Sequence, residues 1–189
     1  MLTSTPQWVA VYTNPRAEKR VAKNLEQEGY EAYLPIKREL HTWSDRKKWV
    51  ETPLLKSYVF AKITMFQESL IRRVSGVSAL VSFDGEVATI PEAEIQMMKD
   101  FLAADVAIQV RTVEQLRRGK WVKIVSGGLE GKVGMLVSDC EDGNFAVEIT
   151  GISMAMVVHV DQEMMELAED YEIPESDTNA KKQKKYTIR

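Results

Sequence analysis

Four basic residues are spaced so that they share one side of a predicted helix. They occupy positions i, i+3, i+4 and i+7: Arg16, Lys19, Arg20 and Lys23. The apolar Ala17, Val21 and Leu25 fall on a different side. Cations held along a rigid surface are suited to binding phosphates, and each neutralised phosphate adds about 0.9 to the salt slope of duplex binding. The sequence therefore predicts a nucleic-acid contact, with a solvated helix face as the alternative.

The distribution of charge supports an N-terminal position for this contact. The net charge is −3, yet residues 16–62 contain eleven Lys or Arg against seven Asp or Glu, and acidic residues dominate from 84 to 175. Arg72 and Arg73, on a second predicted helix, would extend the basic surface if they point the same way. A polyanion is expected to meet the N-terminal part first, and a role in coating nucleic acid along the whole protein is disfavoured.

Aromatic residues gather on the predicted strands and hairpin of the same region. They are Tyr12, Trp43, Trp49, Tyr58 and Phe60. Side chains repeat every two residues along a strand, so Tyr58 and Phe60 share one face and act together, either in the core or as an apolar patch for a partner. The core is the simpler interpretation from the residues alone. Residues 46–48, Arg-Lys-Lys, are interpreted as a charged hairpin turn.

Signatures of catalysis are missing from the sequence. It contains no phosphate-binding G-x-x-x-x-G-K-[ST] loop, no H-E-x-x-H and no paired cysteines at metal spacing. His41 and His159 have no nucleophile or base near them in sequence, and Cys140 is the only cysteine. We expect a protein that is not an enzyme and that uses no metal and no cofactor.

The pattern of elements indicates an α+β domain followed by a small all-β domain. The first 104 residues predict the order β-α-β-β-β-α-β-β-α. Its parts are strand 8–12, helix 14–28 beginning at Asn14-Pro15, hairpin 30–52, strand 58–63, helix 66–75, hairpin 77–90 around Asp84-Gly85, and helix 91–103. Residues 105–115 are predicted as a linker, although they include a possible strand extension. The tail 169–189 is predicted to be disordered.

Residues 116–168 carry only short strand patterns, at 121–125, 133–138, 145–150, 154–160 and 163–167. A five-stranded barrel would accommodate them. No apolar run approaches the roughly 20 residues needed to span a bilayer, and residues 1–7 lack the pattern of a secretory signal. The single cysteine agrees with a reducing compartment, so we expect a cytoplasmic protein without a membrane contact.

Closely spaced glycines separate two of these strands, and the segment 119–136 resembles a KOW motif. Gly127 and Gly131 lie in the expected turn, and Gly134 matches the most characteristic glycine of that motif. Two residues depart from the elongation-factor version, in which Pro and Phe usually stand where this chain has Gly128 and Leu129. The motif occurs in transcription elongation factors and in some ribosomal proteins.

The order of motifs along the chain is similar to that of the NusG family. The segments are 8–12, the helix from residue 16, 53–60, 76–77 and the KOW-like turn. Residues 43–48 look most like the specialised UpxY-type and RfaH-type antiterminators. General NusG usually carries Phe-Pro-Gly where this chain has Leu55-Lys56-Ser57. The resemblance implies an N-terminal NGN domain, an antiparallel sheet with flanking helices, and a C-terminal KOW β-barrel.

In function, the resemblance implies a monomeric factor that binds RNA polymerase and suppresses pausing and termination on particular operons, such as those for surface polysaccharides. It implies docking on the clamp helices of the largest polymerase subunit. The residues that match the family's apolar docking surface are Tyr12, Leu55, Tyr58 and Phe60. Residues Gln67, Glu68 and Ser69 match the region that faces the gate loop of the second-largest subunit.

The same resemblance places Arg16, Arg20 and Lys23 where RfaH-like factors touch the non-template DNA strand. Ribosomal protein S10 or another partner would bind the KOW domain, but general NusG presents a Phe there and this chain has Thr150 before Gly151. Two alternatives stay open at this point. One is a general NusG-type elongation factor, and the other is a ribosome-associated KOW protein that binds RNA.

Overall fold

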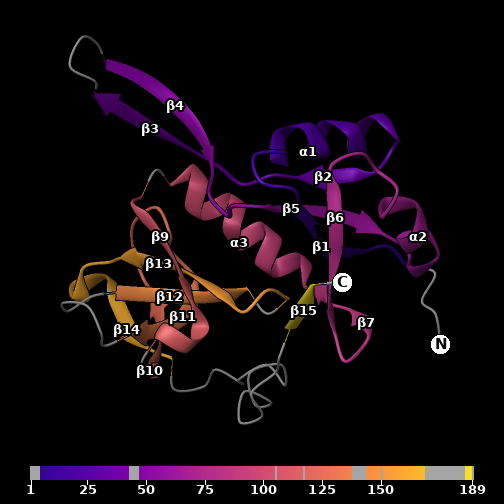
Figure 1. The fold of residues 1–189 in the computed structure, drawn as a ribbon. Coiled ribbons are helices and arrows are strands. Elements are labelled where there is room, and N and C mark those ends of the chain that lie inside the picture. Colours follow the sequence, from indigo (N-terminus) through magenta and orange to yellow (C-terminus); the bar gives the residue numbers. More distant parts are fainter. Residues whose placement is uncertain are drawn as a thin grey trace. The chain divides into compact units, whose positions relative to one another are not determined.

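The computed structural model describes residues 5–42, 47–104, 106–116, 118–137, 144–149, 151–168 and 186–188. The chain divides into two compact units, Met1–Glu92 with Thr187–Arg189, and Ala93–Tyr186 (Figure 1). Each unit has its own main sheet. Residues 43–46, Cys140, Thr150 and the tail 169–185 lie outside the described residues, and the predictions made for them stay untested.

The first unit contains a sheet in the order β15-β6-β1-β5-β2, with β7 paired to β6 and β8 paired to β1. A separate two-stranded sheet, β3-β4, completes its strands. The elements are β1 (Gln7–Thr13), α1 (Glu18–Gln27), β2 (Glu31–Tyr33), β3 (Ile36–Thr42), β4 (Lys47–Pro53), β5 (Tyr58–Ile63), the 3-10 turn η1 (Met65–Gln67), α2 (Glu68–Ile71), β6 (Val77–Phe83), β7 (Glu86–Val87), β8 (Thr89–Ile90) and β15 (Tyr186–Ile188).

Alternation along the central strands sends successive side chains to opposite faces of this sheet. The face covered by α1 and α2 holds one core cluster, which combines strand residues with the apolar sides of the two helices. Its buried members are Val9, Val11, Ala17, Val21, Ala22, Leu25, Val59, Ala61, Ile63, Ile71, Val74 and Leu80. The opposite face carries the even-numbered residues of β1 and β5, and these include the predicted aromatic docking residues.

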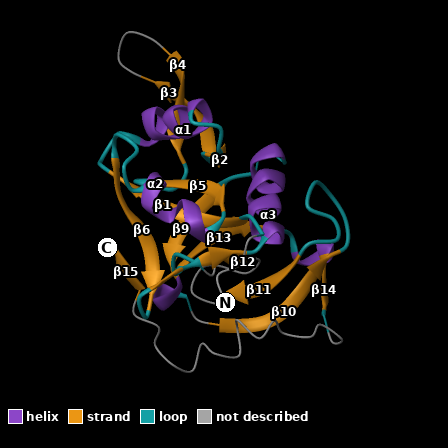
Figure 2. Ribbon diagram, turned by 90° about the vertical axis from the view of Figure 1, so that its right-hand side faces the viewer, coloured by secondary structure: helices purple, strands orange, loops and turns teal. Residues whose placement is uncertain are grey.

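Both predicted hairpins of the first unit form over part of their expected range. Residues 31–33 instead form β2, which pairs with β5, and residues 89–90 form β8, which pairs with β1. Strands β3 and β4 pair in register from Ile36 opposite Pro53 to Thr42 opposite Lys47, and they project away from the main sheet (Figures 1 and 2). Strands β6 and β7 are joined at Asp84 and Gly85, whose φ angles of 51° and 90° suit a tight hairpin turn.

The first helix begins later than the sequence predicts. Proline at residue 15 suggested a start there, but α1 begins at Glu18, and the backbone N–H of Ala17 donates to the carbonyl of Asn14 in a preceding turn. Arg16 has a φ of 62° and lies outside the helix. The predicted helical stripe therefore consists of Lys19, Arg20 and Lys23. The second helix is also shorter than expected, because regular α-helix covers only Glu68–Ile71.

The second unit contains a sheet in the order β14-β10-β11-β12-β13-β9. Its elements are α3 (Glu92–Ala103, whose first residue belongs to the first unit), β9 (Ile108–Thr112), η2 (Val113–Gln115), β10 (Arg118–Ile124), β11 (Val133–Val137), β12 (Asn144–Ile149), β13 (Met154–His159), η3 (Gln162–Met164) and β14 (Met165–Leu167). Strands β9 and β14 are the two edges of this sheet, so these pairings do not show the closed five-stranded barrel that the sequence predicts.

Three predicted boundaries differ in the structure. Residues 186–188 of the tail predicted to be disordered form β15, which pairs with β6. Residues 108–112 of the predicted linker form β9, which pairs with β13 along its whole length. Helix α3 belongs mostly to the second unit, where Phe101 contacts Phe145 with ring centroids 6.2 Å apart. The Lys132 ammonium also donates a hydrogen bond to the Asp100 carboxylate of α3. This bond is the main reason why the pKa of Asp100 is lowered from its ordinary value.

Candidate functional site

The predicted docking aromatics share the sheet face opposite the two helices. Tyr12 lies directly across from Tyr58, with ring centroids 5.4 Å apart in an edge-on contact. Phe60 pairs with Ala10 on one side and with Tyr33 on the other, and the Phe60 and Tyr33 rings stack at 6.3 Å. The structure therefore brings Tyr12, Tyr58 and Phe60 into one row. We call these three residues the aromatic face.

Exposure differs sharply within this row. Phe60 is 0% exposed, Tyr58 8% and Leu55 1%, whereas Tyr12 is half-buried. Burial raises the pKa of the Tyr58 hydroxyl above its ordinary value, and Tyr12 raises it further, so this group stays neutral at physiological pH. In this structure Tyr12 is the member of the aromatic face that presents the most surface.

The turn before β5 is held by a buried carboxylate that the sequence analysis did not single out. The backbone N–H of Ser57 donates to Oε1 of Glu18 at 2.8 Å, and its carbonyl accepts from the N–H of Thr13 at 2.9 Å. Glu18 is only 6% exposed. Ser57 has a φ of 63°, a conformation that glycine adopts without cost and serine does not. An acidic residue in the first turn of a helix is the only sequence signal for this role, and it is unspecific.

Removing this carboxylate is expected to lower the free energy of unfolding by about 1–2 kcal/mol, because Glu18→Ala leaves the half-buried N–H of Ser57 without its acceptor. Glu18→Gln keeps an oxygen at that position and should lose less. Urea unfolding followed by circular dichroism measures both variants. Equal unfolding midpoints for Glu18→Ala and the unchanged protein would show that the bond does not hold the turn.

The basic residues of α1 are exposed, as the helical spacing predicts. Lys19, Arg20 and Lys23 point away from the buried Val21 and Leu25. Nζ of Lys19 lies 3.6 Å from Oε2 of Glu51 on β4, so the helix and the hairpin share one continuous surface. Arg16 is exposed as well, in the turn before the helix.

The second basic pair lies close to this surface. Nδ2 of Asn24 donates to the carbonyl of Ser75, which holds the turn after α2 against α1. A Cβ added at Gly76 would lie 3.2 Å from Nη2 of Arg20, so the Arg20 side chain reaches the same turn. Arg72 and Arg73 in this turn are exposed, and Arg72 pairs with Glu68 at 2.7 Å.

The three residues predicted to face the gate loop differ in their contacts and in their exposure. Oε1 of Gln67 accepts from the N–H of Thr64 at 2.9 Å and so caps η1. Glu68 pairs with Arg72, and only Ser69 of the three is fully exposed. The neighbouring Phe66 and Leu70 are 63% and 48% exposed, and the sequence analysis missed them because their spacing resembles that of a helix core.

The KOW-like glycines form a turn within the second unit. Gly127 and Gly131 have φ angles of 87° and 83°, and the N–H of Gly131 donates to the carbonyl of Ile124. Gly134 serves a different purpose, because an added Cβ would lie 2.5 Å from Cζ of Phe145. These glycines therefore shape the β10-β11 hairpin.

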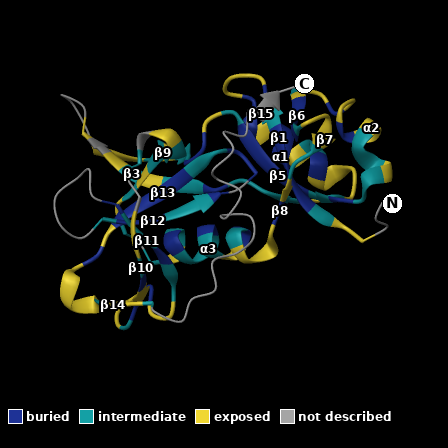
Figure 3. Ribbon diagram, turned by 90° about the horizontal axis from the view of Figure 1, so that it is seen from below, coloured by how far each residue is buried: buried dark blue, intermediate teal, exposed yellow. Residues whose placement is uncertain are grey.

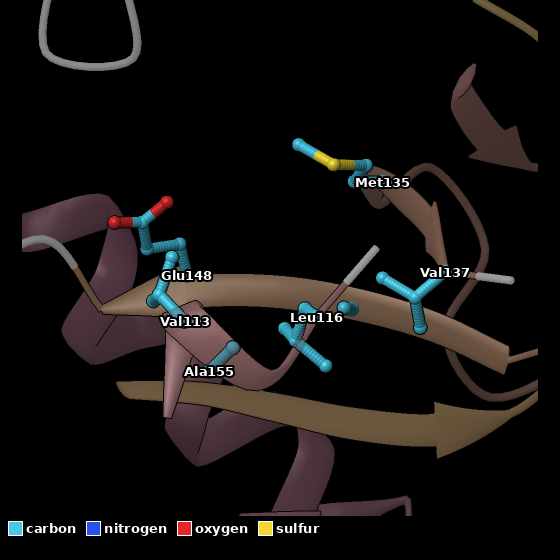
Figure 4. A pocket seen from close by; sticks show the side chains of 7 residues that line it. Val113, Leu116, Met135, Val137, Glu148 and Ala155 are labelled. Carbon is cyan, nitrogen blue, oxygen red and sulfur yellow. The ribbon is translucent and has the colours of Figure 1, made fainter. Parts of the chain in front are cut away.

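An apolar depression lies on the same unit (Figure 4). Seven residues line it: Val113, Leu116, Met135, Val137, Ala146, Glu148 and Ala155. Glu148 is the one ionisable residue among them. No group of three or more His, Cys, Asp or Glu side chains gathers at metal-binding distances within the described residues. In the part of the chain that the structure describes, no helix is both long and apolar enough to cross a bilayer.

The segment that contains the aromatic face matches a known protein family. Residues 6–99 match the family model described as "Transcription termination factor nusG". Residues 6–99 form a NusG-family domain. The predicted docking, gate-loop and DNA-contact residues all lie inside this NusG-family domain, and only the KOW-like glycines lie beyond it.

One solved structure shares the fold. The structure described as "Domain interaction in Thermotoga maritima NusG" is 23% identical, with a TM-score of 0.50, and the match covers 87% of this chain and 98% of that one. Two conformations, A and B, of the MjSpt4:Spt5 complex are 18% and 16% identical, with TM-scores of 0.28 and 0.27. Those matches cover 85% and 88% of this chain and 97% and 99% of those chains. No curated protein sequence matches this chain.

Proposed function

We propose that this chain is a transcription elongation and antitermination factor that binds RNA polymerase through its NusG-family domain. The observation that carries the proposal is the family match over residues 6–99. The half-buried Tyr12 ring, which contacts the Tyr58 ring on the same sheet face, supports it, because a partly exposed aromatic side chain is suited to packing against a partner. Binding of this kind acts without catalysis, by favouring one state of the polymerase.

In this proposal the aromatic face docks on the clamp helices of the largest polymerase subunit through the half-buried Tyr12, because the predicted contacts Leu55 and Phe60 are buried in this structure. The segment of Gln67, Glu68 and Ser69 faces the second-largest subunit. A factor that prefers the elongating state by about 1.4 kcal/mol shifts the pausing equilibrium tenfold. Suppression of pausing and termination follows from that preference.

The exposed cations of α1 and of the turn after α2 would contact the non-template DNA strand. Their support is their common exposure and their position on one continuous surface. A specialised role on particular operons is favoured over a general one by the resemblance of residues 43–48 and by Leu55-Lys56-Ser57. Ser57 is held at a positive φ by Glu18, so this departure from Phe-Pro-Gly is accommodated by a compensating contact.

Transcription in vitro tests the function. Purified polymerase is allowed to transcribe the leader of the operon next to this gene, with and without the protein. We expect shorter pauses and more read-through of terminators with the protein present. Unchanged pausing and termination, together with co-purification with ribosomal particles in place of polymerase, would contradict the proposal and favour a KOW-type RNA-binding protein.

Loss of two helix charges is expected to lower the salt slope of single-strand binding by about 1.4, at about 0.7 for each phosphate contact. The variant Arg20→Ala, Lys23→Ala removes these charges from α1. The variant Lys120→Ala, Lys123→Ala removes two exposed charges from β10 and serves as the matched control. Fluorescence anisotropy of a labelled oligonucleotide over a range of salt concentrations measures the slope. Equal slopes for the two variants would contradict a contact through α1.

A further inference from the structure

The β3-β4 hairpin exposes the outer part of one side of its two-stranded sheet, beyond the half-buried pair of Ile36 and Pro53. Residues directly opposite one another share a face, and the register places three such pairs together: Arg38 with Glu51, Leu40 with Trp49, and Thr42 with Lys47. All six residues are exposed, and exposed segments are drawn yellow in Figure 3. We call these six residues the hairpin platform.

Trp49 gives the platform its chemical character. It is 55% exposed and Leu40 opposite it is 48% exposed, although a tryptophan in a soluble domain is usually mostly buried. The guanidinium carbon of Arg38 lies 5.2 Å from the centre of the Trp49 ring, within the range of a cation–π contact. The ring is therefore held in place by its neighbours while it retains a large accessible surface.

Charge favours an anionic occupant. Arg38 and Lys47 are the cations of the platform, and its one carboxylate, Glu51, is paired with Lys19 of α1. On the reverse side of the hairpin, Glu39 lies 2.7 Å from Lys37, so this acid is also paired. The contact of Lys19 with Glu51 joins the platform directly to the basic residues of α1.

We propose that the hairpin platform binds single-stranded nucleic acid, with an unpaired base stacked on Trp49 and the phosphates beside it held by Arg38, Lys47 and the cations of α1. An aromatic ring beside a cationic track is the combination that single-strand-binding proteins use, because every base has a face that can stack. The inference rests on the nucleic-acid part of the proposed function. It adds a stacking site that the basic helix alone lacks.

The two kinds of contact differ in their dependence on salt. Stacking removes no counterions, whereas a phosphate contact does. Trp49→Ala should therefore weaken binding of a labelled single-stranded oligothymidylate by about tenfold and leave the salt slope unchanged. Trp49→Phe should retain most of the affinity. Arg38→Ala, Lys47→Ala should weaken binding and also lower the slope.

The experiment uses the full chain and anisotropy titrations at several salt concentrations. Val50→Ala, on the reverse side of the hairpin, is the control and should bind the oligonucleotide as the unchanged protein does. A normal affinity of Trp49→Ala, no measurable binding by the unchanged protein, or equal binding of duplex DNA would overturn the inference. Loss of polymerase binding by both Leu40→Ala and Trp49→Ala, with oligonucleotide binding retained, would assign the platform to a protein partner and would also overturn it.

Failure of the proposed function gives a different result. The same preparations are mixed with RNA polymerase and assayed for pausing. If the unchanged protein does not bind polymerase but Trp49→Ala still loses affinity for the oligonucleotide, the function as an elongation factor fails and the stacking site stands. If pausing is suppressed normally and Trp49→Ala binds the oligonucleotide as the unchanged protein does, only the stacking site fails.

Discussion

Phe60→Ala is expected to lower the free energy of unfolding of the NusG-family domain by about 3–5 kcal/mol. Phe60 is 0% exposed and lies on β5, which is placed between β1 and β2 in the sheet. Its directly paired residue on β1 is Ala10. Ala10 is too small to fill the space that the ring leaves. Because domains are stable by only about 5–15 kcal/mol in total, this loss is a large part of the whole.

Urea unfolding of the full chain measures this effect, with Phe60→Leu as the control that keeps most of the apolar volume and should lose much less. A loss below about 1 kcal/mol for Phe60→Ala would show that the ring contributes little packing. The expected loss also affects how docking is tested. Failure of a Tyr58→Ala, Phe60→Ala protein to bind polymerase would not separate a missing contact from an unfolded domain.

Tyr12 offers the cleaner test of docking. It is half-buried at the end of the aromatic face, where its ring meets the Tyr58 ring edge-on. Tyr12→Ala should weaken polymerase binding by at least about tenfold if this face docks, because aromatic residues at the centre of an interface carry much of its energy. Tyr12→Phe should bind normally. Similar binding by all three proteins would refute docking through Tyr12.

Gly134→Val is expected to destabilise the second unit by about 3 kcal/mol or more, because there is no space for a side chain. A Cβ there would lie 2.5 Å from Cζ of Phe145 and 2.8 Å from the backbone oxygen of Ala146. Phe145 is fully buried, and the carbonyl belongs to the paired strand β12, so neither atom can move away easily.

Gly128→Ala, in the turn between β10 and β11, is the matched control. A Cβ added at Gly128 would contact a single residue, Ala104, whose Cβ would lie 3.3 Å away and whose Cα would lie 3.9 Å away. Thermal unfolding of the full chain, followed by circular dichroism, should show a large drop in stability for Gly134→Val and a small change for Gly128→Ala. Equal stability of the two variants would mean that the hairpin can shift to accept a side chain at residue 134.

Much of the first unit could be predicted from local patterns. The apolar runs in residues 8–12 and 58–63, the Asp84-Gly85 pair and the amphipathic spacing in α1 are local signals. The corresponding strands, hairpin turn and helix form, although the bounds of the hairpin and helix differ from those expected. The start of α1 was predicted wrongly because Pro15 is compatible with a first helical turn but does not require one. The actual turn there depends on Gly76 and Ser57, which contact it from distant segments.

The sequence by itself determined which residues could act together. Its periodicity placed Tyr58 with Phe60 and grouped the cations of α1, because side-chain direction follows from the local backbone. Only the tertiary structure decided how accessible each residue is and what it touches. The burial of Phe60, the hold of Glu18 on Ser57 and the exposure of Trp49 beside Arg38 depend on which strands pair and which faces are covered. Those contacts join residues far apart in the chain, and no local pattern encodes them.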